Sequence, residues 1–282
     1  MNKIVSSQKK QLQPFLKWAG GKRWLIQSHP EFFRYRFSGK YIEPFLGGGA
    51  AFAAVEPKRA LLSDTNEELI NLYFQIRQHP HELQKRLEVL HSQHSRLFYY
   101  QYRGQSPGAK MDKAVRMLYL NRTCFNGIYR VNRQGRFNVP MGTKTAVVLP
   151  SDDFVLWAEL LANAELKVCD FEEPIHKAGK GDFIFADPPY TVSHNNNGFL
   201  KYNEVLFSWE DQVRLSIALI SAAKRGAVVV ATNANHPQVV DLYSSFFSIE
   251  TVTRPSTIAA KSNHRGRYEE VIIHNLALED KL

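Results

Sequence analysis

The stretch from residue 41 to residue 64 constrains the fold of this chain more than any other. An apolar run, YIEPF (41–45), leads through three consecutive glycines (47–49) into the small apolar stretch AAFAAV, and ALLSD (60–64) follows. Strand, glycine loop, helix and a second strand that ends in an acid form the opening unit of a nucleotide-binding α/β sheet. At the end of the second strand, Asp64 is placed to accept hydrogen bonds from two ribose hydroxyls.

The glycine loop alone does not identify the ligand. A loop without side chains lets a ligand approach the backbone closely. The GxGxxG template of dinucleotide-binding proteins fits poorly, because its third glycine falls on Phe52. S-adenosylmethionine has no pyrophosphate to hold, so a looser loop suffices for it. A tight turn with a purely structural purpose is the remaining interpretation.

The pattern changes after residue 66. Residues 66–121 are rich in Leu, Glu, Gln, Arg and His at helical spacing, and 122–150 carry the turn signals of a loop. Alternating strands and helices return after 151, with helices expected at 151–163, 208–225 and 236–245. The expected strands are LKVCD (166–170), DFIFADPPY (182–190), GAVVVATN (226–233), FSIETVT (247–253) and EEVIIHN (269–275). The prediction is one discontinuous α/β domain, 1–66 and 151–282, interrupted by a mostly helical subdomain at 67–150.

The tetrapeptide Asp187-Pro188-Pro189-Tyr190 carries the clearest chemistry. It follows the apolar run FIFA, at the carboxyl end of a strand, where open α/β sheets bind ligands. The exocyclic amine of an aromatic base is a poor nucleophile, because its lone pair is conjugated with the ring. Two acceptors directed at its N–H bonds, the Asp187 carboxylate and the Pro188 carbonyl, would free that lone pair. Tyr190 offers a face for stacking an extruded base. An acidic loop with a proline turn is the plainer alternative.

The segment FLKWAGGK (15–22) combines aromatic residues, glycines and lysines. Trp18 is able to stack on a purine, and Lys22 to reach a carboxylate such as that of a methionine moiety. Equally, Trp18 could be a core anchor and the lysines solvated.

Charge indicates an anionic partner. The chain carries a net charge of +9, and nucleic acid is the first candidate for its partner. Two stretches, 113–151 and 253–268, contain Lys and Arg but no acid, and Phe125, Tyr129 and Phe137 are interleaved in the first. Both are expected to contact phosphates, with solvated charged faces as the alternative.

Taken in order, FLKWAGGK, EPFLGGG, Asp64, an insertion and DPPY resemble the Dam-type, α-class DNA adenine-N6 methyltransferases. The insertion contains a stretch, about 121–142, that is similar to the target-recognition hairpin of members that methylate GATC. The resemblance spans nearly the whole chain. It implies a Rossmann-like sheet that uses S-adenosylmethionine and no metal, with a target-recognition subdomain and a target adenine flipped out of duplex DNA.

The resemblance also implies roles for individual residues. The catalytic residues are Asp187, Pro188, Pro189 and Tyr190. The residues of the methyl-donor site are Trp18, Lys22, Glu43, Pro44, Phe45, Gly47, Gly49, Asp64 and Asp187. The residues that contact DNA are Lys17, Arg122, Phe125, Asn126, Ile128, Arg130, Asn138 and Pro140. Within the last set, Lys17 and Arg130 would read guanine edges, and an arginine fork matches the two major-groove acceptors of guanine.

Three positions depart from the family's pattern. Phe125 stands where the family commonly has a tyrosine that wedges between bases, so stacking is kept and the hydroxyl lost. The glycine loop has Gly48 where several members have alanine. Thr143-Lys144-Thr145 stands where an arginine or aromatic phosphate contact is expected, and the flanking-sequence preference is therefore open.

Other functions compete with this hypothesis. They are an RNA or protein-glutamine N-methyltransferase, a non-catalytic DNA-binding module and a dinucleotide-dependent oxidoreductase. The arginine-bearing hairpin disfavours the first, and the intact motifs disfavour the second. Phe52, at the third glycine position of the GxGxxG template, disfavours the third. Cys124 and Cys169 lack metal or disulfide spacing, and neither a signal peptide nor a membrane span is expected. We expect a cytoplasmic monomer, from a bacterium or phage, with orphan and restriction-modification roles both open.

Overall fold

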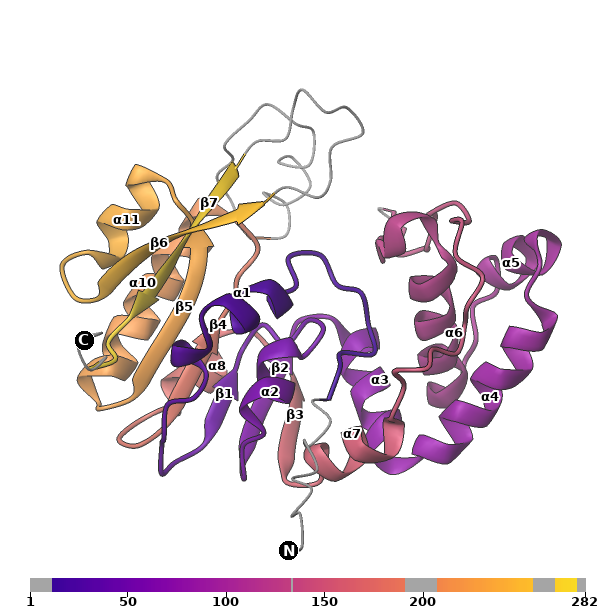
Figure 1. Ribbon diagram of the computed structural model, residues 1–282, viewed down its shortest axis with the longest axis horizontal. Coiled ribbons are helices and arrows are strands. Elements are labelled where there is room, and N and C mark those ends of the chain that lie inside the picture. Colours follow the sequence, from indigo (N-terminus) through magenta and orange to yellow (C-terminus); the bar gives the residue numbers. More distant parts are fainter. Residues whose placement is uncertain (1–11, 133, 191–206, 256–266, 278–282) are drawn as a thin grey trace, which may run out of the picture.

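The computed structural model describes residues 12–132, 134–190, 207–255 and 267–277. Within these ranges seven strands form one sheet in the order β3-β2-β1-β4-β5-β7-β6. The neighbours from β3 to β5 are parallel, and β7 runs antiparallel to both β5 and β6 (Figure 1). The strands are β1 (Tyr41–Glu43), β2 (Ala60–Asp64), β3 (Ala164–Val168), β4 (Phe183–Ala186), β5 (Val228–Ala234), β6 (Ser248–Pro255) and β7 (Arg267–His274). The predicted α/β sheet is confirmed.

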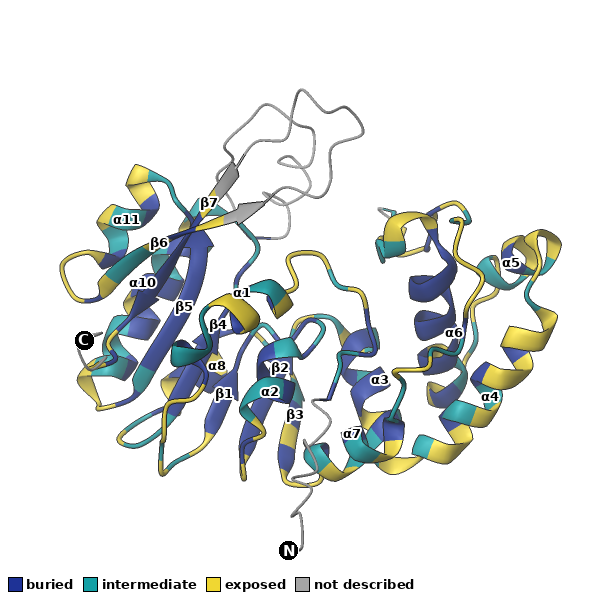
Figure 2. Ribbon diagram, in the orientation of Figure 1, coloured by how far each residue is buried: buried dark blue, intermediate teal, exposed yellow. Residues whose placement is uncertain are grey.

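Helices cover both faces of the sheet because successive side chains of each strand point to opposite sides. In β4, Phe183 and Phe185 belong to one hydrophobic cluster, while Ile184 and Ala186 belong to the other. On the first face lie α1 (Arg23–Ser28), α2 (Ala50–Val55), α3 (Glu67–Gln78) and α7 (Phe154–Leu161). On the second lie α8 (Glu172–His176), α10 (Trp209–Lys224) and α11 (Pro237–Tyr243). Dark blue strands between partly exposed helices show this layering in Figure 2.

The insertion is mostly helical, as predicted. It begins with α3, continues with α4 (Pro80–Gln93), α5 (Arg96–Arg103) and α6 (Lys110–Thr123), and ends in a loop that contains the short helix η2 (Phe125–Gly127). Helix α6 is buried throughout from Ala114 to Thr123 and forms the centre of this group. One hydrophobic cluster runs without a break from the sheet face into these helices. The loop at 124–142, predicted to contact DNA, is therefore carried on a packed support.

Some elements differ from expectation. The strand expected at 182–190 ends at Ala186, because Pro188 and Pro189 have no N–H with which to continue a ladder. Strand β3 lies two residues earlier than expected, and helix α8 was not expected at all. Much of the second basic stretch, 253–268, lies outside the described residues. The exact domain boundaries stay predictions.

Candidate active site and nucleic-acid interface

The predicted site residues meet at one edge of the sheet. Strand β1 pairs with β2 on one side and with β4 on the other, all parallel, so Glu43, Asp64 and Asp187 lie at or just beyond neighbouring carboxyl ends. The direction of strand progression reverses between β1 and β4. Open α/β sheets bind their ligands at such a reversal, in the crevice beyond the strand ends.

The glycine loop after β1 packs closely against the chain's own side chains. Gly47 and Gly49 have positive φ angles of 47° and 65°. A Cβ at Gly47 would lie 2.8 Å from Cδ1 of Trp18, and one at Gly49 would lie 2.6 Å from the Tyr73 hydroxyl oxygen. Glycine is therefore required here by left-handed backbone and by packing, in addition to any approach of a ligand.

Asp64 holds this loop from the end of β2. Its Oδ2 accepts a hydrogen bond from the Gly47 N–H at 3.1 Å, and its Oδ1 accepts one from the Asn66 N–H at 3.0 Å. Burial raises the pKa of the Asp64 carboxyl, and these backbone donors oppose the rise. The Thr65 N–H is a third backbone donor to this carboxylate, and a carboxylate has about four acceptor sites, so capacity for a ribose hydroxyl remains.

Lys22 is a buried lysine next to Asp187. Its side chain is 4% exposed, and its Nζ lies 2.9 Å from Asp187 Oδ1, 2.9 Å from the Gly20 carbonyl oxygen and 3.5 Å from Glu270 Oε2. Burial opposes the charge, but Asp187, Tyr190 and Glu270 outweigh burial and raise the pKa of Lys22. Of the three oxygens, those of Asp187 and Gly20 lie at hydrogen-bond distance from the ammonium, and Glu270 forms a longer ion pair with it. Lys22 is thus directed at the carboxylate of Asp187, the predicted catalytic residue.

The Asp187 carboxylate is engaged on one oxygen. Oδ1 accepts hydrogen bonds from the Thr232 hydroxyl at 2.6 Å and from Lys22 at 2.9 Å. Among the described residues, no donor is bonded to Oδ2 or to the carbonyl of Pro188. Burial raises the pKa of Asp187, while Lys22 and Thr232 oppose this rise. Two acceptors of one short segment thus remain available to an amine.

Residues from three other elements hold the rest of the Asp-Pro-Pro-Tyr loop. Tyr190 donates its hydroxyl hydrogen to Glu270 Oε2 on β7 at 2.7 Å. The Gln212 amide on α10 donates to the Pro189 carbonyl at 3.5 Å, and Asn233 on β5 donates to the Gln212 amide oxygen at 2.9 Å. Sequence reasoning missed Thr232, Gln212, Asn233 and Glu270. A signal existed for Glu270, a charged residue next to the apolar run VII of its strand.

The remaining donor-site candidates flank this edge. Glu43 is buried and accepts a hydrogen bond from the Tyr41 hydroxyl at 2.8 Å. Burial raises the pKa of Glu43 well above its usual range, which favours the neutral acid. Pro44 is buried, and Phe45 stacks on Phe171 with ring centroids 5.5 Å apart.

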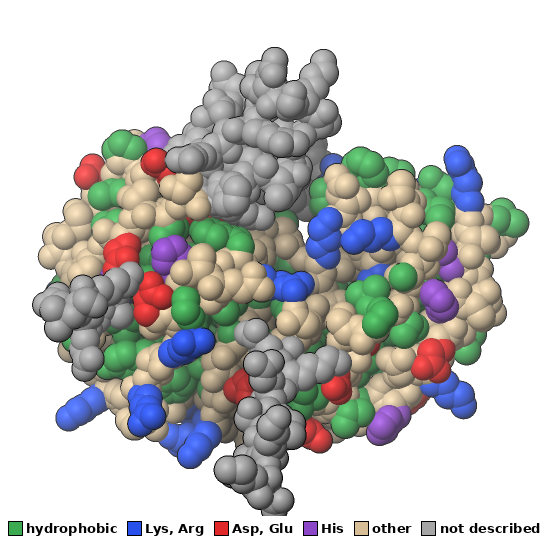
Figure 3. All heavy atoms as spheres, in the orientation of Figure 1, with side chains coloured by type: hydrophobic (Ala, Val, Ile, Leu, Met, Phe, Trp, Pro, Cys, Tyr) green, Lys and Arg blue, Asp and Glu red, His purple; other side chains and the backbone are tan. Residues whose placement is uncertain are grey.

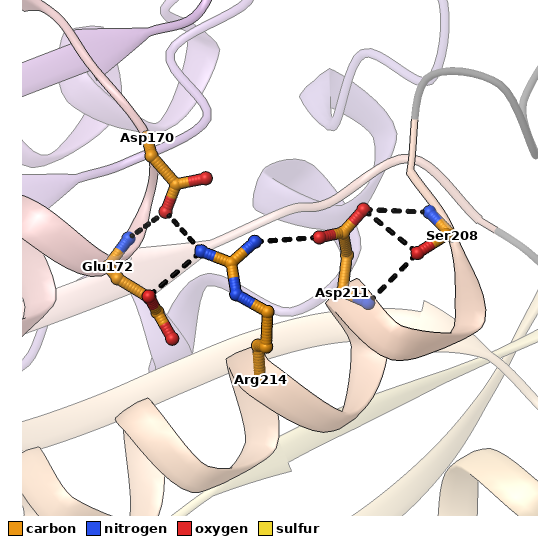
Figure 4. Close-up of polar contacts among 5 residues, drawn as sticks. All are labelled: Asp170, Glu172, Ser208, Asp211 and Arg214. Atoms are coloured by element: carbon orange, nitrogen blue, oxygen red, sulfur yellow. Dashed lines mark hydrogen bonds and ion pairs between the residues drawn. The ribbon is translucent and has the colours of Figure 1, made fainter.

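A polar network supports the neighbouring strand end. Arg214 on α10 binds Asp170 at 3.0 Å and Glu172 at 2.8 Å, both beyond β3, and Asp211 at 2.7 Å (Figure 4). Ser208 and Asp211 cap the start of α10 reciprocally. This network joins α10 to the segment that carries Phe171, and thereby supports the ring on which Phe45 stacks.

The predicted recognition segment doubles back on itself. Antiparallel bridges pair Cys124 with Met141 and Val131 with Phe137. Asn121 joins its base to the N-terminal segment: its amide exchanges hydrogen bonds of 3.0 and 2.8 Å with the backbone of Lys17. The predicted DNA contacts Lys17, Phe125, Asn126, Arg130, Asn138 and Pro140 are exposed, and Ile128 is half-buried. Lys and Arg side chains are visible on this face in Figure 3.

Two aromatic residues of the basic stretch support the loop from inside. Tyr129 stacks on Trp18, with ring centroids 6.4 Å apart, and contacts the buried Phe137 at 5.1 Å. The Tyr129 hydroxyl also donates to Glu68. Trp18 therefore lies against both the glycine loop and the recognition segment, and links the two predicted sites.

Arg122 departs from its predicted role. Its guanidinium forms a bidentate pair with Asp152, with N···O distances of 2.6 and 2.7 Å, and both side chains are 4% exposed. It also donates to the carbonyls of Val147 and Phe15. With these partners inside the protein, Arg122 is not free to contact DNA, and the expectation is corrected to a structural role.

Two features are absent from the described residues. Among them, no cluster of His, Cys, Asp and Glu has the composition of a metal site. No helix in the same ranges has the length and apolar character of a membrane span.

Comparison with known proteins agrees with this geometry. Residues 18–258 match the family model of D12 class N6 adenine-specific DNA methyltransferases. The chain is 34% identical over 281 residues to the type II methyltransferase M1.LlaDCHI of Lactococcus lactis subsp. cremoris, covering 96% of this chain and 98% of that one. It is 34% identical to the DNA N-6-adenine-methyltransferase of Escherichia phage P1 over 91% of this chain and 34% of that longer protein.

The DNA adenine methylase of Vibrio cholerae is 32% identical, over 93% of this chain and 96% of its own. Among solved structures, a precorrin-6y C5,15-methyltransferase of Geobacter metallireducens covers 89% of this chain and 85% of its own at 9% identity, with a TM-score of 0.33. The sequence matches extend over both the sheet and the insertion. The chain therefore belongs to the family of D12 class N6 adenine-specific DNA methyltransferases.

Proposed function

We propose that this enzyme transfers a methyl group from S-adenosylmethionine to the N6 amine of adenine within GATC in duplex DNA, with the target base flipped into the Asp-Pro-Pro-Tyr pocket. The observation that carries the proposal is the placement of two acceptors, Asp187 Oδ2 and the Pro188 carbonyl, to which no described residue donates, on a loop that is bonded to Glu270 and Gln212. A planar amine has two N–H bonds, and two acceptors match them.

The donor site follows from the same sheet edge. Asp64 is an acceptor for ribose hydroxyls, the glycine loop brings its backbone to this edge, and Phe45 and Trp18 supply apolar surface near it. Glu43, Pro44 and Lys22 complete the proposed set, Lys22 by holding Asp187 at its border. When bound, the donor supplies an electrophilic methyl group on a sulfonium.

The reaction then depends on hydrogen bonding and placement. Asp187 Oδ2 and the Pro188 carbonyl accept the two amine hydrogens and localise the nitrogen lone pair. The Tyr190 ring stacks on the extruded base and directs that lone pair at the methyl carbon. With the donor bound, the carbon–sulfur bond would break as the nitrogen–carbon bond forms, and the Asp187 carboxylate would accept the surplus proton of the nitrogen and release it to solvent.

Recognition is assigned to the exposed surface of the insertion. Lys17 and Arg130 would read guanine edges, while Phe125 would fill the space left in the DNA stack. Asn126, Ile128, Asn138 and Pro140 would contact neighbouring bases. Asn126 has a φ of 55° and Gly127 one of 66°, and this turn presents Phe125 with 53% of its surface exposed.

The test uses labelled donor and three duplexes: unmethylated GATC, the same duplex with N6-methyladenine at the target, and a scrambled sequence. Label should enter adenine of the first duplex only. Label in the scrambled duplex would contradict GATC, label in cytosine would contradict the base assignment, and no transfer to any DNA would contradict the activity. Sequencing of methylated bases in DNA from cells that express the chain checks the same site in a genome.

A further inference from the structure

Glu270 is a buried acid beside the reaction centre that the proposed donor and target contacts do not use. It lies on β7, its side chain is 9% exposed, and it accepts the Tyr190 hydroxyl at 2.7 Å. Its Oε2 also lies 3.5 Å from Lys22 Nζ. A buried carboxylate is costly unless it is paired and hydrogen-bonded. The position of this acid therefore calls for a purpose beyond packing.

We propose that Glu270 is a positioning residue for methyl transfer, which fixes the Tyr190 ring and shares the Lys22 ammonium with Asp187. The inference rests on the proposed function of the Asp-Pro-Pro-Tyr pocket. In this proposal a residue of β7, far from that tetrapeptide in sequence, controls both the position of the Tyr190 ring and the charge around the Asp187 carboxylate.

The ring of Tyr190 is held at two points. Glu270 fixes the hydroxyl end, and Lys22 Nζ lies 4.9 Å from the ring centroid. Burial raises the pKa of the Tyr190 hydroxyl well above its usual range, so it remains a donor to Glu270. A stacking surface held in place before the base arrives has less freedom to lose on binding.

Glu270 also affects the charge around Asp187, because both acids share one lysine. One ammonium, Lys22, faces two carboxylates, Asp187 and Glu270. If Glu270 were neutral, the ammonium would act on Asp187 alone and make it a weaker acceptor. The groups around Asp187 are Lys22, Thr232, Tyr190, Glu270 and, from the end of β1, Glu43. Glu270 raises the pKa of Asp187, and Lys22 lowers it.

The test compares Glu270→Gln with Glu269→Gln. The first keeps an acceptor for Tyr190 and removes the charge. The second makes the same chemical change at an exposed neighbour on the same strand. For Glu270→Gln, the acidic limb of the kcat/KM profile should move to lower pH by about one unit, because a like charge beside Asp187 is lost. The control should keep the wild-type limb.

A second readout does not depend on methyl transfer. Fluorescence of 2-aminopurine at the target position reports whether the base is extruded and stacked. Glu270→Gln replaces the charged acceptor of the Tyr190 hydroxyl by a weaker neutral one, and Tyr190→Phe removes that hydrogen bond altogether while Glu270 stays near Lys22. Tyr190→Phe and Glu270→Gln should each change the fluorescence of the complex, and the double variant should change it by less than the sum.

Three results would overturn the inference: an unmoved acidic limb in Glu270→Gln, additive fluorescence changes, or loss of activity that merely follows loss of thermal stability. Should Glu270→Gln fail to fold, Tyr190→Phe alone decides, and wild-type fluorescence in that variant overturns the inference. A wild-type enzyme that methylates no DNA contradicts the proposed function instead, while the fluorescence comparison still tests the hold on Tyr190.

Discussion

The predicted catalytic loop with its surroundings and the predicted recognition segment are built in opposite ways. Lys22 and Asp187 are bound by side chains from distant parts of the chain. Phe125 and Arg130 are exposed, and Arg130 has no hydrogen bond to any described residue. Catalysis by hydrogen bonding requires groups that are already oriented before the substrate arrives. Base reading leaves its donors and stacking surfaces free until DNA supplies their partners.

The sharpest test of this contrast lies within one basic stretch, at Arg122. Arg122→Met should lower the free energy of unfolding by about 3–5 kcal/mol, because Asp152 would stay buried without its partner. Chemical denaturation measures the change. Lys113→Met, an exposed position on the same helix, should shift it by less than about 0.5 kcal/mol. Equal effects of the two variants would place Arg122 at the surface.

The next largest effect concerns the chemistry. Asp187→Asn should lower kcat by about 10²–10³-fold, because an amide is a weaker acceptor than a carboxylate for a nitrogen that becomes positive. Affinity for DNA should change little, since the Asp187 side chain is paired with Lys22 and Thr232 and is not one of the exposed predicted DNA contacts. Single-turnover rates and a binding titration separate the two quantities. Asp241→Asn, on the exposed side of α11, is the control, and comparable rates for both variants would refute the role of Asp187.

The two regions also differ in how far the sequence predicted them. The glycine loop, Asp64 and the Asp-Pro-Pro-Tyr loop were found because strand periodicity placed each at a strand end, and parallel strands end at one edge. Glu270 and Thr232 act through pairing with a strand distant in sequence, which no local pattern reveals. Arg122 was misassigned because neither the resemblance to the recognition hairpin nor the charge of an acid-free stretch tells which cation is buried. Its partner, Asp152, lies outside that acid-free stretch.

The expected effect of replacing Arg130 is smaller, and it concerns base specificity and not stability or rate. Arg130→Ala should leave the free energy of unfolding within about 0.5 kcal/mol of wild type. Discrimination against substitution of one guanine in GATC should fall by about 1–3 kcal/mol, because a bidentate contact to that base would be lost. Rates on duplexes with each single base replaced give the profile. A uniform loss over all sequences would show that Arg130 contacts phosphate instead.

The smallest effect is expected for Phe125→Tyr, which tests, together with Phe125→Ala, whether the predicted recognition segment works by stacking. Phe125 is 53% exposed, so Phe125→Tyr restores the residue common in the family with no steric conflict inside the protein. The stacking face is unchanged, and a gained neutral hydrogen bond is worth about 0.5–1.5 kcal/mol. Phe125→Ala, which removes the ring, should weaken base extrusion by more than this, about 1–3 kcal/mol. If the tyrosine variant changed extrusion more than the alanine variant did, the hydroxyl and not the ring would govern the wedge, and the recognition loop would depend on a polar contact that this chain lacks.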